Sequence, residues 1–294
     1  MRGKQRRISH FFGPVGVSLQ QLTPVISRRG SFGRIELFNH PELGKVFVLN
    51  GEVQHVEAWA PLYHEPLVHL AGAFVSSIKD VLILGGGTLY AASEVLKYKS
   101  VERVVLLDHD PVVTESTAQY YEHARACLAD SRLSLQHKDA YASVAGLRNQ
   151  FDLVINDGSD LLSIPARQSS RSMVSAIGTV LKPGGVAADV VYRHLFERKR
   201  IQRTLSQFRR KFRFALSLIF LPEYHGVLHV LCIWGNRSSQ VNQLMHQPRN
   251  REQRRWRADP KACPCVYYDP RFLGYYLYLP RYFKSALGSK RTSS

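Results

Sequence analysis

The chain has 294 residues, of which 45% are hydrophobic and 21% are charged, a composition typical of a globular protein with one large domain and one small domain. No apolar segment is long enough to cross a bilayer, and no apolar signal region follows the basic N-terminus. We therefore expect a cytoplasmic protein without a membrane partner. Four cysteines are too few for a disulfide framework, and the pair Cys263 and Cys265 has no second pair to complete a metal site.

The formal net charge of +17 would attract nucleic acid or acidic proteins. Much of this charge lies in three runs, at residues 1–7, 198–213 and 249–257. The second run also carries apolar residues at helical spacing, which is typical of the solvated face of an amphipathic helix. Because no nucleic-acid-binding motif accompanies the runs, the sequence favours a solvated surface, although nucleic acid or an acidic partner stays open.

The first part of the chain predicts a basic arm and a small β domain. Residues 1–25 are expected to form a poorly ordered arm. Residues 26–75 are predicted to form a β-hairpin domain, in which Asn50-Gly51 is a strong two-residue turn signal. Helix-like spacing over residues 59–73 then predicts a helix that links this domain to the rest of the chain.

Strands alternate with helices over residues 76–294, a pattern that predicts a mostly parallel sheet. Its first strand, residues 81–84, is entirely apolar and ends in Gly85, Gly86 and Gly87. A second apolar strand ends about twenty residues later in Asp108, the spacing at which a carboxylate can bind a ribose hydroxyl. A glycine-rich turn alone is often only a turn, but the downstream acid favours a nucleotide-type ligand.

Acidic residues follow several of the predicted strands. Ligands of open α/β sheets bind beyond the carboxyl ends of the strands, where Asp108, Asp139, Asp157 with Asp160 and, less clearly, Asp189 are expected. Asp139 is placed to accept a hydrogen bond from an adenine amino group. Asp157 is placed to take a proton from an attacking nucleophile. Taken alone, the segment from Asp157 to Asp160 is equally well explained as an ordinary turn.

Six segments, in order, resemble the spermidine synthase family of aminopropyltransferases over roughly residues 30–285. They are the hairpin at 44–54, Tyr63-His64-Glu65, the glycines at 85–87, the acidic turn at 157–160, the helix stop at 181–185 and the tyrosine-rich tail at 267–280. The resemblance implies an α/β, Rossmann-like fold of an S-adenosylmethionine-dependent transferase. Its mostly parallel sheet would carry an antiparallel edge hairpin and be preceded by the small antiparallel β domain.

The resemblance also implies an activity and a set of site residues. The chain would move an aminopropyl group from decarboxylated S-adenosylmethionine to an amine, as a homodimer and without a metal, with Asp157 as the general base. The implied donor-binding residues are Gln54, Gly85, Gly86, Gly87, Thr88, Asp108, Asp139 and Ala140. The implied amine-binding residues are Tyr63, His64, Asp160 and Tyr224.

The chain departs from the family pattern after the glycine turn, in residues 186–192 and in residues 163–166, which keep only part of the family's "GPA". Thr88 stands where the family has an acid, which is understood to bind the ammonium group of the donor, and residues 186–192 lack the family's "QGE". A threonine hydroxyl carries no charge, and a charge-assisted hydrogen bond is roughly twice as strong as a neutral one. Two alternatives therefore stay open. One is a methyltransferase that uses intact S-adenosylmethionine, and the other is a non-catalytic family member that binds an acidic partner.

Overall fold

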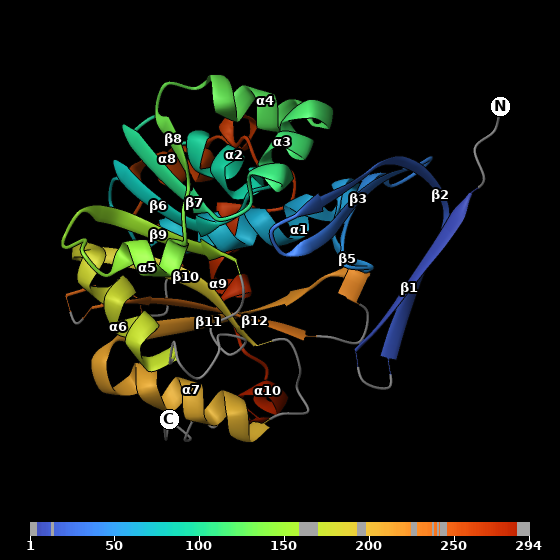
Figure 1. The fold of residues 1–294 in the computed structure, drawn as a ribbon. Helices are drawn as coiled ribbons and strands as arrows, with labels where there is room; N and C mark the ends of the chain where they lie inside the picture. The colour runs from blue at the N-terminus through green and yellow to red at the C-terminus, as the bar shows by residue number, and fades with distance from the viewer. Residues whose placement is uncertain are drawn as a thin grey trace.

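The computed structural model consists of two sheets with helices packed on both faces of the larger one (Figure 1). It describes residues 5–12, 15–158, 170–192, 198–224, 228–236, 238–239, 241 and 246–286. Within these residues, the strand order is β1-β2-β3-β4-β5 in the first sheet and β11-β12-β10-β9-β6-β7-β8 in the second. No helix of the described residues is long and apolar enough to span a membrane.

The N-terminal sheet is antiparallel throughout. Its strands are β1 (Arg6–Phe12), β2 (Val15–Gly30), β3 (Gly33–His40), β4 (Gly44–Leu49) and β5 (Glu52–Val56). The predicted hairpin turn joins β4 to β5, and both of its residues have positive φ, 53° at Asn50 and 83° at Gly51. These angles are those of a two-residue turn that matches the twist of the flanking strands.

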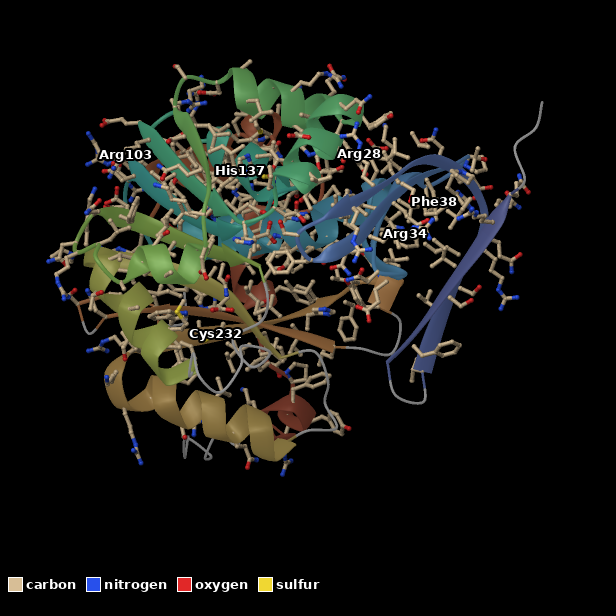
Figure 2. All side chains as sticks on the ribbon, in the orientation of Figure 1. Arg28, Arg34, Phe38, Arg103, His137 and Cys232 are labelled. Atoms are coloured by element: carbon tan, nitrogen blue, oxygen red, sulfur yellow. The ribbon has the colours of Figure 1, made fainter. Side chains whose placement is uncertain are left out.

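The prediction of a poorly ordered arm over residues 1–25 is wrong for most of these residues, because β1 begins at Arg6 and β2 begins at Val15. Leu19 and Leu22 of β2 are buried in a small core with residues of β3, β4 and β5, including Phe38, which Figure 2 labels on this sheet. Gln21, at φ 56°, lies between the two leucines, where the pairing of β2 with β1 shifts its register. The buried residues therefore lie three apart instead of two, and simple alternation does not reveal the strand.

A short helical segment, η1 (Glu57–Trp59), α1 (Ala60–Glu65) and η2 (Pro66–Leu70), leads from the first sheet to the second. The sequence predicted one helix over residues 59–73. Pro66 has no N–H to donate, and the segment changes from α-helix to π-helix at this residue. Figure 1 shows α1 between the two sheets, so its side chains can contribute to a site shared by both.

The second sheet contains the predicted parallel strands and the predicted antiparallel edge. Its strands are β6 (Asp80–Gly85), β7 (Arg103–Asp108), β8 (Leu133–His137), β9 (Phe151–Asp157), β10 (Leu181–Tyr192), β11 (Arg213–Phe220) and β12 (Leu228–Gly235). Strands β6 to β10 are parallel to one another, whereas β12 pairs antiparallel with both β10 and β11. From β6 the chain adds β7 and β8 on one side and β9 on the other. The sheet therefore has a topological switch point between β6 and β9.

Helices cover both faces of this sheet. They are α2 (Tyr90–Leu96), α3 (Pro111–Tyr120), α4 (Glu122–Ala129), α5 (Ala140–Val144), α6 (Ser170–Val180), α7 (Arg198–Lys211), η3 (Pro222–Tyr224), α8 (Arg251–Ala258), η4 (Pro260–Ala262), η5 (Pro270–Phe272), α9 (Leu273–Tyr276) and α10 (Arg281–Ala286). Alternate residues of β6 enter two cores. Val81 and Ile83 pack with α2, α4 and α8, while Leu82 and Leu84 pack with α5, α6, α7 and Cys232, which is labelled in Figure 2. Burial on both faces explains the uninterrupted apolar run of this strand.

Candidate active site

The glycine turn after β6 approaches the end of β9 closely. Gly85 and Gly86 have φ values of 74° and 76°, which glycine adopts without strain. A Cβ atom on Gly85 would lie 2.6 Å from Cα of Gly158, and a Cβ atom on Gly86 would lie 2.9 Å from Oδ2 of Asp157. The first two positions of the turn therefore require glycine, and the turn brings the backbone beside Asp157 at the switch point.

Asp108, at the end of β7, holds the same turn in place. Its Oδ2 accepts a hydrogen bond from the Gly87 N–H at 2.8 Å, and its Oδ1 accepts one from the Asp110 N–H at 2.8 Å. Burial raises the pKa of Asp108, although these two hydrogen bonds oppose the shift. Asp110 in turn accepts a hydrogen bond from the Ser31 N–H at 2.7 Å, which connects the N-terminal sheet to this loop.

Asp157 lies at the end of β9, directly beside Gly85 in the parallel register. Its carboxyl group is buried and forms a hydrogen bond with the side chain of Tyr63. Burial and, secondarily, the nearby charge of Asp108 raise the pKa of Asp157 from 3.8 to about 8, while the Tyr63 hydrogen bond opposes this shift. A carboxyl group in this state is suited to proton transfer near neutral pH.

His64 also lies beside the Asp157 carboxyl group, and its ring contacts that of Tyr63 edge-on. Its Nδ1 is 3.0 Å from the carbonyl oxygen of Ala60, to which it can donate a hydrogen bond, and its Nε2 is 3.7 Å from Oδ2 of Asp157. Burial lowers the pKa of His64 to about 4, so the imidazole is neutral at pH 7. With the proton on Nδ1, the Nε2 lone pair faces Asp157.

These groups line a cavity of about 450 Å³. The predicted site residues that line it are Gln54, Tyr63, His64, Gly85, Gly86, Gly87, Thr88, Asp108, Asp157 and Tyr224. Asp139 and Ala140 are not among the lining residues. Asp139 is exposed and, directly before α5, accepts a hydrogen bond from the Ala142 N–H at 3.0 Å. Asp160 lies outside the described residues.

The structure adds polar residues that the sequence did not assign to the site. They are His55, Asp110, Asn156, Glu223 and His229; Asp189, which the sequence placed less clearly at a strand end, also lines the cavity. Asp189 and Glu223 are almost completely buried, and burial raises the pKa of Glu223 to about 7. The Asn156 amide donates a hydrogen bond to Asp189 at 3.2 Å. Among the described residues, no lysine or arginine lines the cavity, so the cavity is suited to a cationic ligand.

A second polar cluster lies away from the cavity and contains His69, Glu94 and Cys265, whose ligand atoms are within 4.8 Å of one another. The two ring nitrogens of His69 are 2.9 Å from the Tyr98 hydroxyl and 2.9 Å from Glu94. Glu94 also pairs with Lys97 at 2.6 Å. The His69 ring and the Glu94 carboxylate thus already interact with other protein groups, and we assign no metal to this cluster.

Comparison with known proteins places this fold and cavity in a family. The family model described as "Spermine/spermidine synthase domain" matches residues 60–244, which contain the glycine turn, Asp108 and Asp157. The chain belongs to the spermine/spermidine synthase family. The family resemblance seen in the sequence is therefore confirmed.

Curated relatives of the chain include two kinds of transferase. It is 28% identical to a polyamine aminopropyltransferase of Lachnospira eligens over 58% of this chain and 59% of the relative. It is 30% identical to polyamine aminopropyltransferase 1 of Aquifex aeolicus, over 61% of this chain and 65% of the relative. It is also 30% identical to putrescine N-methyltransferase 2 of Nicotiana attenuata, over 59% of this chain and 48% of the relative. The matched regions thus span about half to two thirds of these relatives.

Solved structures match the whole chain. A crystal structure of spermidine synthase from Thermotoga maritima superposes with a TM-score of 0.81 at 22% identity, covering 98% of this chain and 97% of that one. A spermidine synthase in complex with the transition-state analogue AdoDATO superposes with a TM-score of 0.83 at 22% identity. The predicted fold class, a Rossmann-like transferase fold preceded by an antiparallel β domain, is confirmed.

Proposed function

We propose that the protein transfers an alkyl group from an adenosyl sulfonium donor to the nitrogen of an amine, with Asp157 as the general base. The observation that carries this proposal is the buried Asp157 carboxyl group beside the glycine turn, in a cavity lined by acids. In the form suggested by the relatives named polyamine aminopropyltransferase, the transferred group is aminopropyl and the donor is decarboxylated S-adenosylmethionine.

The nucleoside of the donor would lie along the glycine turn. Gly85, Gly86 and Gly87 allow close approach to the backbone, and Asp108 lies where a ribose hydroxyl can be bound. The Lys138 N–H bonds the carbonyl oxygen of Asp108 at 3.1 Å, so Asp139 and Ala140 follow beside the predicted ribose position and are proposed to contact the base. Gln54 and Thr88 would contact the tail of the donor.

The amine would lie between Tyr63, Asp157 and Tyr224, with Asp160 as a further proposed contact. Asp189 and Glu223 add two more carboxyl groups to the same cavity. An ammonium group near these acids would favour their ionised forms, because an opposite charge lowers the pKa of a carboxyl group. The acids can therefore hold the cationic ends of a polyamine while one nitrogen is positioned for reaction.

In the reaction step, the lone pair of the amine nitrogen forms a bond to a carbon attached to the sulfonium sulfur. The carbon–sulfur bond breaks, and its electron pair stays on the sulfur, which becomes part of a neutral thioether. Asp157 accepts the proton that the amine nitrogen gives up. A base whose pKa lies near the working pH is efficient in this role, as the raised pKa of Asp157 provides.

Methyl transfer from intact S-adenosylmethionine is a second candidate. Two observations favour it: Thr88 leaves the cavity wall uncharged at that position, and several relatives are named putrescine N-methyltransferase. The chemistry at nitrogen and the role of Asp157 would be the same. Only the carbon that moves and the nucleoside product would differ.

Product analysis tests the proposal and separates its two forms. The protein is incubated with decarboxylated or intact S-adenosylmethionine and a panel of amines that includes putrescine and spermidine, and the nucleoside product is identified by mass. Methylthioadenosine would show aminopropyl transfer, and S-adenosylhomocysteine would show methyl transfer. If neither product forms with any amine, the proposal is overturned, and a non-catalytic family member that binds an acidic partner is favoured instead.

We further propose that the protein acts as a homodimer, as the family resemblance implies. From the sequence pattern we also propose a cytoplasmic location and two domains, residues 26–75 and 76–294. Light scattering coupled to gel filtration should give twice the chain mass of 33.4 kDa. A mass that stays monomeric at micromolar concentration would contradict the dimer. Cell fractionation tests the location.

A further inference from the structure

His55, on β5, is a buried cavity residue whose ring nitrogens both lack a hydrogen-bond partner. Its side chain lines the cavity and is 5% exposed. Its ring packs edge-on against Tyr90 at 4.5 Å between centroids, with Tyr121 at 5.5 Å. A buried N–H and a buried lone pair without partners are costly, and native structures rarely keep them without a functional reason. The arrangement indicates a ligand group that bonds to this imidazole.

His55 and Thr88 belong to the same part of the cavity wall. His123 donates a hydrogen bond to the carbonyl oxygen of Thr88 at 2.9 Å and packs on Tyr90 at 3.7 Å between ring centroids. His55 contacts the same Tyr90 ring. Thr88 directly follows the glycine turn, so the tail of a donor bound along that turn would reach this wall.

The hydrogen-bonding groups of this wall are suited to an anion. His55 offers an N–H, Thr88 a hydroxyl and Gln54 a side-chain amide. Burial, together with the neighbouring imidazoles of His64 and His123, lowers the pKa of His55 to about 3, so its ring is neutral at pH 7. Glu57, whose charge reaches Tyr90 and Tyr121, is already paired with Lys45 at 3.3 Å.

The acids that line the cavity lie elsewhere, at the ends of β7 and β9, in β10 and in η3. An ammonium group could donate to the lone pair of His55, but the acids that would stabilise its charge line other parts of the cavity. A carboxylate would accept a hydrogen bond from the N–H of the neutral His55 ring and would lie apart from those acids. A carboxylate is thus the ligand group that this wall fits.

Resting on the function proposed above, we infer that His55, together with the Thr88 hydroxyl, binds the carboxylate of a donor that keeps its amino-acid tail. The donor is then intact S-adenosylmethionine rather than its decarboxylated form. Of the two forms of the reaction, this choice favours methyl transfer, in which S-adenosylhomocysteine leaves as the neutral thioether.

Calorimetric titration with three nucleosides tests this inference on the full chain. Wild-type protein is expected to bind S-adenosylmethionine about tenfold more tightly than decarboxylated S-adenosylmethionine. His55→Leu should lose that preference but bind methylthioadenosine, which has no tail, within about twofold of wild type. The melting temperature of His55→Leu should not fall, because the substitution removes an unpartnered buried group.

Two further variants make the assignment specific. His55→Gln keeps an N–H donor and should retain most of the preference for the carboxylated donor. Thr88→Asp places a negative charge on the same wall and should reverse the preference.

Three outcomes separate this inference from the proposed function. If wild-type protein binds the decarboxylated donor at least as tightly, or if His55→Leu weakens methylthioadenosine equally, His55 does not recognise a carboxylate. If only the decarboxylated donor is bound and consumed, the inference fails while the proposed alkyl transfer stands. If none of the three nucleosides binds, both fail.

Discussion

Nε2 of His64 lies 3.7 Å from Oδ2 of Asp157, and each side chain is only 6% exposed. This distance is too long for a hydrogen bond, so His64 does not hold the Asp157 proton. Burial keeps the carboxyl group protonated near neutral pH, and the neutral imidazole adds no positive charge that would ionise it. A cationic amine would supply that charge, so binding of the acceptor would prepare the base for its own reaction.

Asp157→Asn should abolish most of the turnover with little loss of donor binding. The amide has nearly the same shape but cannot accept the proton, and loss of a general base typically costs about 10²–10⁴-fold in rate. Initial rates of nucleoside product formation, with the affinity for methylthioadenosine measured by calorimetry, check this. Turnover comparable to that of wild type would show that another group accepts the proton.

The same substitution should change how stability depends on pH. In the unfolded chain Asp157 ionises above 3.8, whereas in the folded protein it keeps its proton to about 8. Between these values the folded state binds more protons, so Asp157 makes wild-type protein less stable as pH rises. Asp157→Asn removes this effect.

The melting temperature of Asp157→Asn relative to wild type should therefore increase from pH 5 to pH 8, by about 2 °C per pH unit at most. Thermal unfolding at matched ionic strength measures the difference. If the difference between the two proteins stays constant over this range, the pKa of Asp157 is not raised in the folded state.

Gly86→Ala should prevent donor binding, and Gly184→Ala provides a matched control. Both glycines have similar positive φ, 76° and 79°, so alanine is strained at either position by about 1 kcal/mol. Only at Gly86 would the new Cβ meet neighbours, Oδ2 of Asp157 at 2.9 Å and a methyl group of Ile83 at 3.3 Å. Titration with methylthioadenosine should show no binding by Gly86→Ala and normal binding by Gly184→Ala. Equal loss in both variants would point to general strain.

Gln253→Leu should destabilise the fold by about 3 kcal/mol, because it leaves buried polar groups without partners. The Gln253 amide donates hydrogen bonds to the His69 carbonyl oxygen at 2.8 Å and to the Tyr98 hydroxyl at 2.6 Å, and it accepts one from the Tyr268 hydroxyl at 2.9 Å. Arg254→Gln, at the next and exposed position of α8, should change stability by less than about 0.5 kcal/mol. Urea unfolding compares the two variants, and equal midpoints would contradict the importance of this network.

Local patterns in the sequence were enough for much of the fold. The apolar run of β6, the glycines after it and the turn at Asn50-Gly51 each depend on neighbouring residues, and each forms as expected. Strand β2 was missed because Gln21 breaks its alternation. The roles of Glu223 and His55 in the cavity were also missed, because their local sequence carries no signal of what lies opposite them.

Residues 63–65 show which features of the site could be predicted from the sequence and which depend on the tertiary structure. The sequence placed Tyr63, His64 and Glu65 together, and the first two do line the cavity. Glu65 instead accepts hydrogen bonds from the backbone N–H groups of Val266, Tyr267 and Tyr268, at 2.8, 2.7 and 2.6 Å, and so ties the C-terminal segment to α1. Turn chemistry and periodicity are properties of adjacent residues, so the sequence by itself determined the strands, the glycine turn and the acid at the end of β9. Only the tertiary structure decided how deeply that acid is buried, that the His64 imidazole faces it, and where each side chain of a motif points. These features depend on sheet order and register, which join residues far apart in the sequence.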